Sequence, residues 1–445
     1  MCGIFGVTNN KNSVFLTYVA LYSLQHRGQE SCGIVSFGKN GYKYYNGMGL
    51  VQEVFDKELI NELSGTTAIG HVRYSTTGSS TITNAQPLFF NTKFGEFAVA
   101  HNGNIVNSKE LKTKLSSSGA IFQTTTDSEI IAHLISKSKR ANFIDALVES
   151  LKELKGAYSF VFLYKDMVIA ARDPWGFRPL VVGKLGNSFA FASETCAFDV
   201  TGYDFYCEVM PGEIFIAKNS EINKIVFQHI NKYYRCIFEQ VYFARPDSFV
   251  LGRSIFMARY ETGRNLAREV KGINADIVSG VPDSGTAYAL GFSKESKIPY
   301  YPVFMKNHYA PRSFLAPQQS LREFIADLKL APIKDNIEGK KIILIDDSLV
   351  RGTTSKKIVS KLKNSGAKKV IFLSASPPIK GPCYYGIDTP TEQELIANRM
   401  EINEIEKFIG VDKLHYIKLE NLIKSCGRGD RNFCTACFDR KYPVL

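Results

Sequence analysis

The sequence contains no long apolar run and no long basic run. Its apolar stretches, such as residues 342–345 and 370–373, have the length of single strands, whereas a membrane-spanning helix needs about 18 or more apolar residues. The net charge is +12, with 55 Lys and Arg against 43 Asp and Glu, yet the Lys residues are scattered. We therefore expect no membrane span and no nucleic-acid partner, and we expect part of the positive charge to serve an anionic small substrate.

Internal repeats and low-complexity segments are also absent. At 445 residues, of which 44% are apolar, the chain is long enough for two or three domains. Residues 1–230 are rich in short β-like runs among helical patterns, whereas from about residue 255 helices alternate with short apolar strands. We therefore predict two domains, residues 1–232 and 233–445. The first is an α/β mixture with antiparallel strands, and the second has βαβ units around a parallel sheet.

Cys2, directly after Met1, is the most informative residue of the chain. Removal of a Met that precedes a small residue leaves a thiol beside a free α-amino group. A thiolate is a strong nucleophile, and an α-amino group titrates near pH 8, where a general base is effective. One residue would then supply both nucleophile and base. This interpretation predicts that no leader precedes Cys2 and that the protein is cytoplasmic.

Three later groups supply what an amide hydrolase for free glutamine needs. The Arg73 guanidinium suits the α-carboxylate, and the Asp127 carboxylate suits the α-ammonium. The Asn102 side chain and the Gly103 N–H are donors for a tetrahedral oxyanion. Each group alone also fits a surface ion pair, a turn or a helix cap. Together, in this order after Cys2, they predict a glutaminase.

Residues 2–230 resemble the class II glutamine amidotransferases, which are N-terminal-nucleophile (Ntn) hydrolases. The resemblance implies an αββα sandwich with Cys2 as nucleophile and base. It also implies a set of glutamine-binding or oxyanion groups, namely Arg27, Gly28, Arg73, Asn102, Gly103 and Asp127. Because His26, His71 and His101 lie beside these motifs, a Cys/His hydrolase is an alternative. The flanking residues carry the pattern, so we expect structural roles for the histidines.

Residues 342–354, IILIDDSLVRGTT, form the strongest motif of the second half. A predicted strand ends at Asp346 and Asp347, and a short loop then leads into a helix. The N–H groups and dipole at that helix N-terminus make an anion site for a phosphate. The two carboxylates can hold ribose hydroxyls or Mg²⁺. Ligands of such sheets bind at the carboxyl ends of the strands, where these loops lie.

This string resembles the signature of type I phosphoribosyltransferases, which bind phosphoribosyl pyrophosphate (PRPP). The resemblance implies Asp346, Asp347 and Ser284 as the Mg²⁺ contacts, and residues 350–354 around the 5′-phosphate. It implies a mobile lid over residues 306–323, which keeps water from an oxocarbenium-like transition state. The implied PRPP-binding residues are Asp283, Ser284, Lys306, Arg312, Arg322, Asp346, Asp347, Val350, Arg351, Gly352, Thr353 and Thr354.

The whole chain resembles the glutamine PRPP amidotransferases, which commit PRPP to purine synthesis. The resemblance implies that ammonia released at Cys2 displaces pyrophosphate from PRPP and gives 5-phosphoribosylamine. It also implies a homotetramer and purine-nucleotide feedback inhibitors. In the predicted lid, His308 and Pro311 stand where the family has Arg and Gly, so lid mobility and its pH dependence stay open.

Two alternatives belong to other functional classes. One is a different class II amidotransferase, such as glucosamine-6-phosphate synthase, but the signature that begins at Asp346 disfavours it. The other is a non-catalytic PRPP-sensing regulator, which the intact Cys2, Arg73 and Asp127 disfavour.

The nine cysteines do not indicate a disulfide framework in a chain expected in the cytoplasm. The CxxC pair Cys434 and Cys437 is consistent with zinc, iron–sulfur or redox chemistry. The strings around Cys236 and Cys383 resemble the family branch that carries a 4Fe-4S cluster. The resemblance therefore implies Cys236, Cys383, Cys434 and Cys437 as cluster ligands, with a structural or oxygen-sensing role, and leaves Cys426 as a spare. Thiolates also suit zinc.

Overall fold

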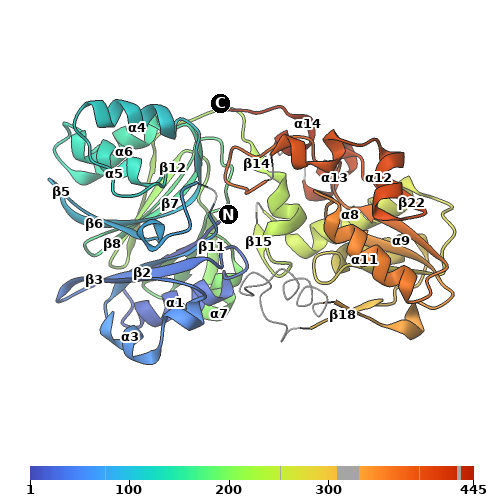
Figure 1. Ribbon diagram of the computed structural model, residues 1–445. Helices are drawn as coiled ribbons and strands as arrows, with labels where there is room; N and C mark the ends of the chain where they lie inside the picture. Colours follow the sequence, from blue (N-terminus) through green and yellow to red (C-terminus); the bar gives the residue numbers. More distant parts are fainter. Residues whose placement is uncertain (76, 251, 308–329, 390, 428–431) are drawn as a thin grey trace.

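The computed structural model describes residues 1–75, 77–250, 252–307, 330–389, 391–427 and 432–445. Figure 1 shows two lobes, one formed by the elements up to β13 and the other by the later elements. Within the described residues, no helix is both long and apolar enough to cross a membrane.

The first lobe contains two antiparallel sheets that pack face to face. The seven-stranded sheet has the order β11 (Asp204–Glu208), β9 (Val181–Leu185), β10 (Ser188–Ala192), β1 (Gly3–Val7), β4 (Thr67–Arg73), β2 (Ser31–Gly38) and β3 (Gly41–Met48). The six-stranded sheet has the order β13 (Glu221–Val226), β12 (Glu213–Lys218), β8 (Met167–Arg172), β7 (Gly156–Tyr164), β6 (Gly95–Ile105) and β5 (Leu88–Thr92). A buried apolar layer that includes Ile4, Ile69 and Val161 joins the two sheets.

Helices cover the outer face of each sheet. The seven-stranded sheet carries α1 (Ser13–Ser23), α2 (Val51–Val54), α3 (Lys57–Glu62) and α7 (Cys196–Thr201). The six-stranded sheet carries α4 (Ser108–Ser117), α5 (Glu129–Lys137) and α6 (Phe143–Glu153). The α6 helix begins where the Asn142 side chain accepts a hydrogen bond from the Asp145 N–H, a typical N-cap. These layers form the predicted αββα sandwich.

The second lobe is built on a four-stranded parallel sheet. Its order is β17 (Ile277–Gly280), β20 (Lys341–Asp346), β21 (Lys369–Ser374) and β22 (Lys413–Tyr416). One face packs against α8 (Ile255–Glu269), α9 (Thr286–Ser296) and α13 (Leu419–Cys426). The other packs against α11 (Thr353–Asn364) and α12 (Ile402–Ile409). This arrangement confirms the predicted parallel sheet of the phosphoribosyltransferase type.

Shorter elements surround this sheet. They are β14 (Arg235–Cys236), which pairs in parallel with β23 (Phe433–Cys434), β15 (Phe249–Val250), β16 (Arg253–Ser254), β18 (Phe304–Lys306), β19 (Leu330–Pro332), α14 (Ala436–Asp439), the π-helical turn η2 (Glu239–Phe243), and the 3-10 turns η1 (Ile82–Asn84), η4 (Lys334–Asn336), η5 (Glu392–Glu394) and η6 (Ile396–Asn398). The turns η5 and η6 directly precede α12 in the chain. The domain division near residue 232 falls between β13 and β14 and stays a prediction.

Candidate active site

Cys2 lies where the two sheets of the first lobe meet. Its backbone N–H donates to Oδ1 of Asn102 at 3.1 Å, and its Sγ lies 3.6 Å from the carbonyl oxygen of Tyr74. Asn102 belongs to β6 of one sheet, whereas Tyr74 directly follows β4 of the other. The Cys2 backbone is thus held by a side-chain amide and its thiol by a backbone carbonyl, and Cys2 is only 9% exposed.

Asn102 has an unused donor beside this thiol. Its side chain is fully buried, and its amide nitrogen has no hydrogen-bond partner among the residues that the structure describes. Buried amide donors are almost always satisfied, so an unpaired one next to a nucleophile supports the predicted oxyanion role. Gly103 has φ +156°, and a Cβ there would lie 2.0 Å from the Ala157 carbonyl oxygen. Only glycine therefore fits at this position.

Replacing Asn102 by Ala is expected to lower kcat for glutamine hydrolysis by about 100- to 1,000-fold, because one oxyanion donor is lost. Ammonia-dependent synthesis, assayed on the same sample, is the control for folding. A kcat within threefold of wild type, by a coupled glutamate assay, would count against the oxyanion role.

Arg73 and Asp127 are buried near the same point of the fold. Arg73, at the end of β4, pairs with Glu30 and donates to the carbonyl oxygens of Ser79 and Thr77, both at 3.2 Å. The Asp127 carboxylate accepts the Ile105 N–H at 2.8 Å, at the end of the strand that carries Asn102. Arg73 is therefore held at the end of β4, and Asp127 at the end of β6, the strand that carries Asn102.

Arg27 contacts the backbone of Cys2, and Gly28 lies close to the backbone of β4. The Arg27 side chain is fully buried, and its Nε donates to the Cys2 carbonyl oxygen at 2.9 Å. A Cβ on Gly28 would lie 2.5 Å from the Val72 carbonyl oxygen, so this residue lets the backbone approach β4. The geometry favours positioning of Cys2 over direct contact of glutamine with the Arg27 guanidinium.

The histidines near these motifs have structural partners. Burial lowers the pKa of His71 to about 3, and its Nε2 lies 3.0 Å from the His101 carbonyl oxygen. Burial also lowers the pKa of His101. His26 contacts Glu194 at 2.8 Å. In the described part of the chain, no histidine forms a hydrogen bond with Cys2 Sγ, which disfavours the Cys/His alternative.

The second predicted centre lies at the carboxyl end of β20. The Asp346 carboxylate accepts the Asp347 N–H at 2.9 Å, and the Ser284 hydroxyl lies 3.5 Å from it. The Ser348 hydroxyl donates to Asp347 at 2.6 Å. Burial and the neighbouring Asp347 raise the pKa of Asp346 well above its ordinary value. Two crowded carboxylates with a hydroxyl form an oxygen-rich set that fits Mg²⁺.

The loop after Asp347 ends at the N-terminus of α11. Gly352 caps this helix with φ +76°, and a Cβ there would lie 2.6 Å from the side chain of Ile396. The helix begins at Thr353, so its free N–H groups and two hydroxyls can bind a phosphate. Arg351 pairs with Glu394 at 3.1 Å.

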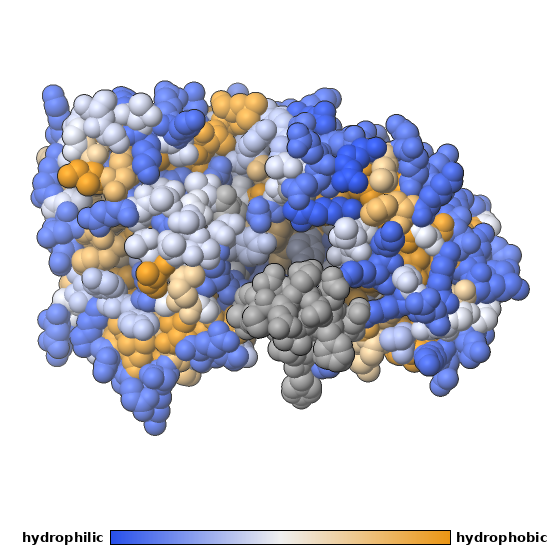
Figure 2. Space-filling view, in the orientation of Figure 1, coloured by the Kyte–Doolittle hydropathy of each residue, from blue (hydrophilic) through white to orange (hydrophobic). Residues whose placement is uncertain are grey.

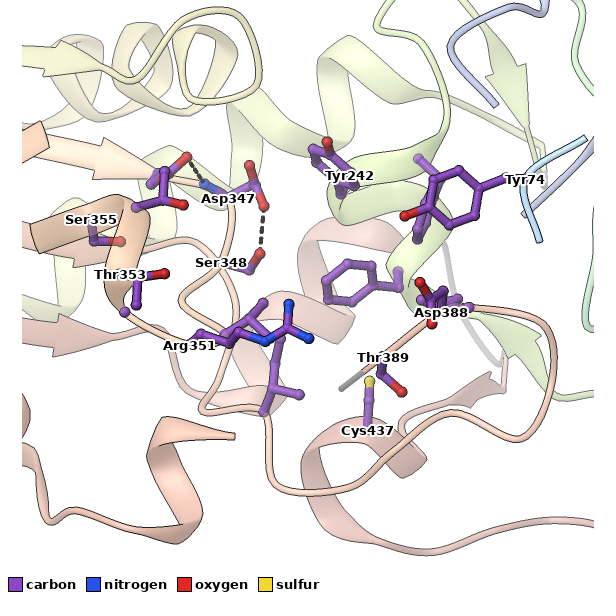
Figure 3. A pocket seen from close by; sticks show the side chains of 18 of the residues that line it. Tyr74, Tyr242, Asp347, Ser348, Arg351, Thr353, Ser355, Asp388, Thr389 and Cys437 are labelled. Carbon is purple, nitrogen blue, oxygen red and sulfur yellow. Dashed lines mark hydrogen bonds between the residues drawn. The ribbon is translucent and has the colours of Figure 1, made fainter. Parts of the chain in front are cut away.

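A cavity of about 480 Å³ opens over this loop. Figure 3 shows Asp347, Ser348, Thr353 and Ser355 on one side of it, and Tyr74, Tyr242 and Asp388 facing them. The surface is hollowed between the two lobes (Figure 2). The cavity thus reaches from the phosphate loop to Tyr74, whose carbonyl contacts the Cys2 thiol.

Of the predicted lid, residues 306–323, the structure describes Lys306 and Asn307. Lys306, at the end of β18, forms an ion pair with Asp283. Arg312 and Arg322 lie outside the described residues, as do His308 and Pro311.

The four predicted cluster cysteines meet at a second, small cavity. Cys236 and Cys434 are partners in the β14–β23 pair, and with Cys383 and Cys437 they line a cavity of about 20 Å³. Burial raises the pKa of the Cys236 thiol to about 11. In the described ranges, no three His, Cys, Asp or Glu side chains have the spacing to hold one metal ion. Cys426, at the end of α13, does not line this cavity.

Comparisons with known proteins point to one family. Residues 71–200 match the family model described as glutamine amidotransferase domain. The amidophosphoribosyltransferase of Archaeoglobus fulgidus is 45% identical over 450 residues, which cover 100% of this chain and 98% of that protein. That of Bacillus subtilis is 44% identical over 449 residues, covering 100% and 94%. The chain belongs to the amidophosphoribosyltransferase family.

A solved structure of the amidophosphoribosyltransferase family has the same fold throughout. It is the glutamine PRPP amidotransferase from Bacillus subtilis, complexed with ADP and GMP. It matches this chain with a TM-score of 0.94 and 42% identity, covering 100% of this chain and 98% of that one.

Some residues of this amidophosphoribosyltransferase site were not predicted from the sequence. Tyr74, Tyr242 and Asp388 line the cavity, and Glu194 and Glu239 hold Arg27. Because these contacts join segments more than 100 residues apart, no local pattern signals them.

Proposed function

We propose that this chain hydrolyses glutamine at Cys2 and transfers the ammonia to PRPP, giving 5-phosphoribosylamine and pyrophosphate, the first committed step of purine biosynthesis. Its full-length identity to amidophosphoribosyltransferases supports this function. The observation that carries it is the single cavity that joins the phosphate loop after Asp347 to Tyr74 beside the Cys2 thiol. The direct test is pyrophosphate release from PRPP, measured with glutamine and, separately, with ammonia.

The glutaminase half-reaction uses groups already near Cys2. After loss of Met1, the free α-amino group takes the thiol proton, and Sγ attacks the amide carbon of glutamine. The Asn102 amide N–H and the Gly103 N–H stabilise the oxyanion. The C–N bond then breaks, ammonia leaves with the transferred proton, and water hydrolyses the thioester to glutamate. Arg73 and Asp127 hold the α-carboxylate and α-ammonium of the substrate.

The transferase half-reaction takes place over the Asp347 loop. The N-terminus of α11, with Thr353 and Thr354, binds the 5′-phosphate, while Lys306 and Asp283 border the pyrophosphate. Ammonia forms a bond to the anomeric carbon as the bond to pyrophosphate breaks. Mg²⁺, held by Asp346, Asp347 and Ser284, would neutralise charge on the leaving pyrophosphate.

The four-cysteine cavity supports a 4Fe-4S cluster, held by Cys236, Cys383, Cys434 and Cys437. Thiols are the soft donors that such clusters need, and the Tyr385 N–H donates to Cys383 Sγ at 3.3 Å, a bond typical around cluster sulfurs. A bound cluster would supply a covalent tie between β14 and β23. The proposed reaction takes no step through it.

Anaerobically purified protein is expected to be brown, with roughly four iron and four sulfide per chain, and to bleach in air. Cys437→Ser should lose most of the iron, whereas Cys426→Ser, the matched control outside the cavity, should keep it. Metal analysis of the three proteins tests this. Colourless protein with stoichiometric zinc would refute the iron assignment and leave the four-cysteine site standing.

We also propose how the protein is regulated, how it assembles and where it is located. The Bacillus subtilis structure is complexed with ADP and GMP, which supports purine nucleotides as feedback inhibitors here. A homotetramer and a cytoplasmic location are also proposed, on the resemblance alone. A different class II amidotransferase and a PRPP-sensing regulator are disfavoured by the full-length identity.

A further inference from the structure

A buried charge network lies behind Cys2. Arg27, Arg178, Glu194 and Glu239 all have side chains with 0% exposure. Glu239 accepts two hydrogen bonds from Arg27, at 2.8 and 3.0 Å, and lies 3.4 Å from Arg178. Glu194 pairs with Arg27 from the other side. The two arginines and the two glutamates are therefore paired with one another out of reach of solvent, where an unpaired charge would be costly.

The Arg27 guanidinium connects this network to the nucleophile. Its two Nη groups face Glu239 and Glu194, and the remaining Nε donates to the Cys2 carbonyl oxygen at 2.9 Å. Because a guanidinium is planar and rigid, the two hydrogen bonds that Glu239 accepts from Arg27 fix the direction in which Nε points. The position of the Cys2 carbonyl group depends on that direction, and so does the position of the thiol, which belongs to the same residue.

Glu239 belongs to η2, an element of the second lobe. The same turn carries Tyr242, which together with Phe243 lines the cavity of about 480 Å³ at the proposed PRPP site. Arg178 also donates through Nε to the Tyr385 carbonyl oxygen at 2.9 Å, two residues beyond Cys383. The network that orients Cys2 is therefore built from both halves of the chain.

We propose that Glu239 is a positioning residue for glutamine hydrolysis, supplied by the second lobe and acting through Arg27 on Cys2. The inference rests on the proposed glutaminase function. Without the second carboxylate, Arg27 has Glu194 as its one remaining anion and turns away from the Cys2 carbonyl. A misplacement of the nucleophile by about 1 Å can lower a rate by about 100-fold.

Glu239→Gln removes the charge and places an amide N–H against the guanidinium. We expect kcat for glutamine hydrolysis to fall about 100-fold while the glutamine KM changes less than about twofold. Labelling of Cys2 by an electrophilic glutamine analogue should slow by a similar factor, and ammonia-dependent synthesis should persist. Glu239→Asp, which keeps the charge but is one methylene shorter, should lose about tenfold.

The matched control is Glu269→Gln in the second lobe. Glu269 is also a buried carboxylate, and it accepts hydrogen bonds from His415, at 2.8 Å, and from Asn421. It has no contact with Arg27, so its variant should keep both activities.

Three outcomes would overturn the inference. Both Glu239 variants could hydrolyse glutamine as fast as wild type, which removes any positioning role. They could lose the glutamine and ammonia activities by equal factors, which indicates a purely structural role. The loss could appear in the glutamine KM alone, which indicates substrate binding. A wild type without glutaminase activity would instead contradict the proposed function itself.

Discussion

Replacing Cys2 by Ala is expected to abolish glutamine hydrolysis and to leave ammonia-dependent synthesis of phosphoribosylamine intact. Removal of a catalytic nucleophile typically costs on the order of 10⁶-fold in kcat, and the geometry offers no substitute. Among the cysteines that the structure describes, Cys2 is the one that contacts Asn102, the proposed oxyanion donor, through its backbone N–H. The proposed PRPP site lies over the Asp347 loop in the other lobe, so its chemistry should not depend on the thiol.

Cys32→Ala is the matched control for this variant. Cys32 is fully buried in β2, next to the strand that leads to Tyr74, and burial raises the pKa of its thiol to about 12. A neutral thiol is a poor nucleophile, so this variant should keep glutaminase activity. Glutamate release and pyrophosphate release, measured on both variants, separate the two sites. Residual hydrolysis above the buffer rate in Cys2→Ala would remove Cys2 from the mechanism.

The sequence predicted those parts of the site that lie within single continuous motifs. Asp346 and Asp347 follow a buried apolar strand, and the helix after them begins at Thr353, as the apolar run followed by Arg-Gly-Thr-Thr predicts. The αββα layers and the parallel sheet were also predicted. The αββα layers are what the resemblance to the class II amidotransferases implies, whereas the parallel sheet follows from helices that alternate with short apolar strands.

The contacts between the lobes could not be predicted in this way. Gly386 approaches the backbone of Gly103 so closely that a Cβ would lie 2.8 Å from it, and Asn104 donates to the Tyr384 carbonyl oxygen at 2.9 Å. In sequence, these pairs are about 280 residues apart. The contact of Arg27 with Glu239, which lies 212 residues away, could not be predicted for the same reason. The sequence around a buried arginine does not show which carboxylates pair with it, so that pairing becomes known only from the tertiary structure.

Asp346→Asn is expected to lower ammonia-dependent synthesis and to leave glutamine hydrolysis intact, which is the reverse of the result expected for Cys2→Ala. Ammonia-dependent synthesis should fall by about 100- to 1,000-fold, because the proposed anionic ligand for Mg²⁺ and ribose is lost, while glutamine hydrolysis without PRPP persists. Asp276→Asn is the matched control. Asp276 precedes β17 and accepts the Lys341 N–H at 2.7 Å, at the amino ends of β17 and β20 and so at the other end of these strands from Asp346. Its variant should keep both activities.

The same substitution should stabilise the protein when Mg²⁺ and PRPP are absent. Burial and Asp347 raise the pKa of Asp346 in the folded state, so the folded chain binds this proton more tightly than the unfolded chain does. The stability that the proton contributes is complete at low pH and is lost as pH rises toward the raised pKa. Asn carries no charge at any pH, so the gain in unfolding free energy over wild type should grow from pH 5 to pH 8. Urea unfolding in EDTA at those two pH values measures it. If the unfolding free energy rises by the same amount at both pH values, or falls at pH 8, then ionised Asp346 does not destabilise the folded protein.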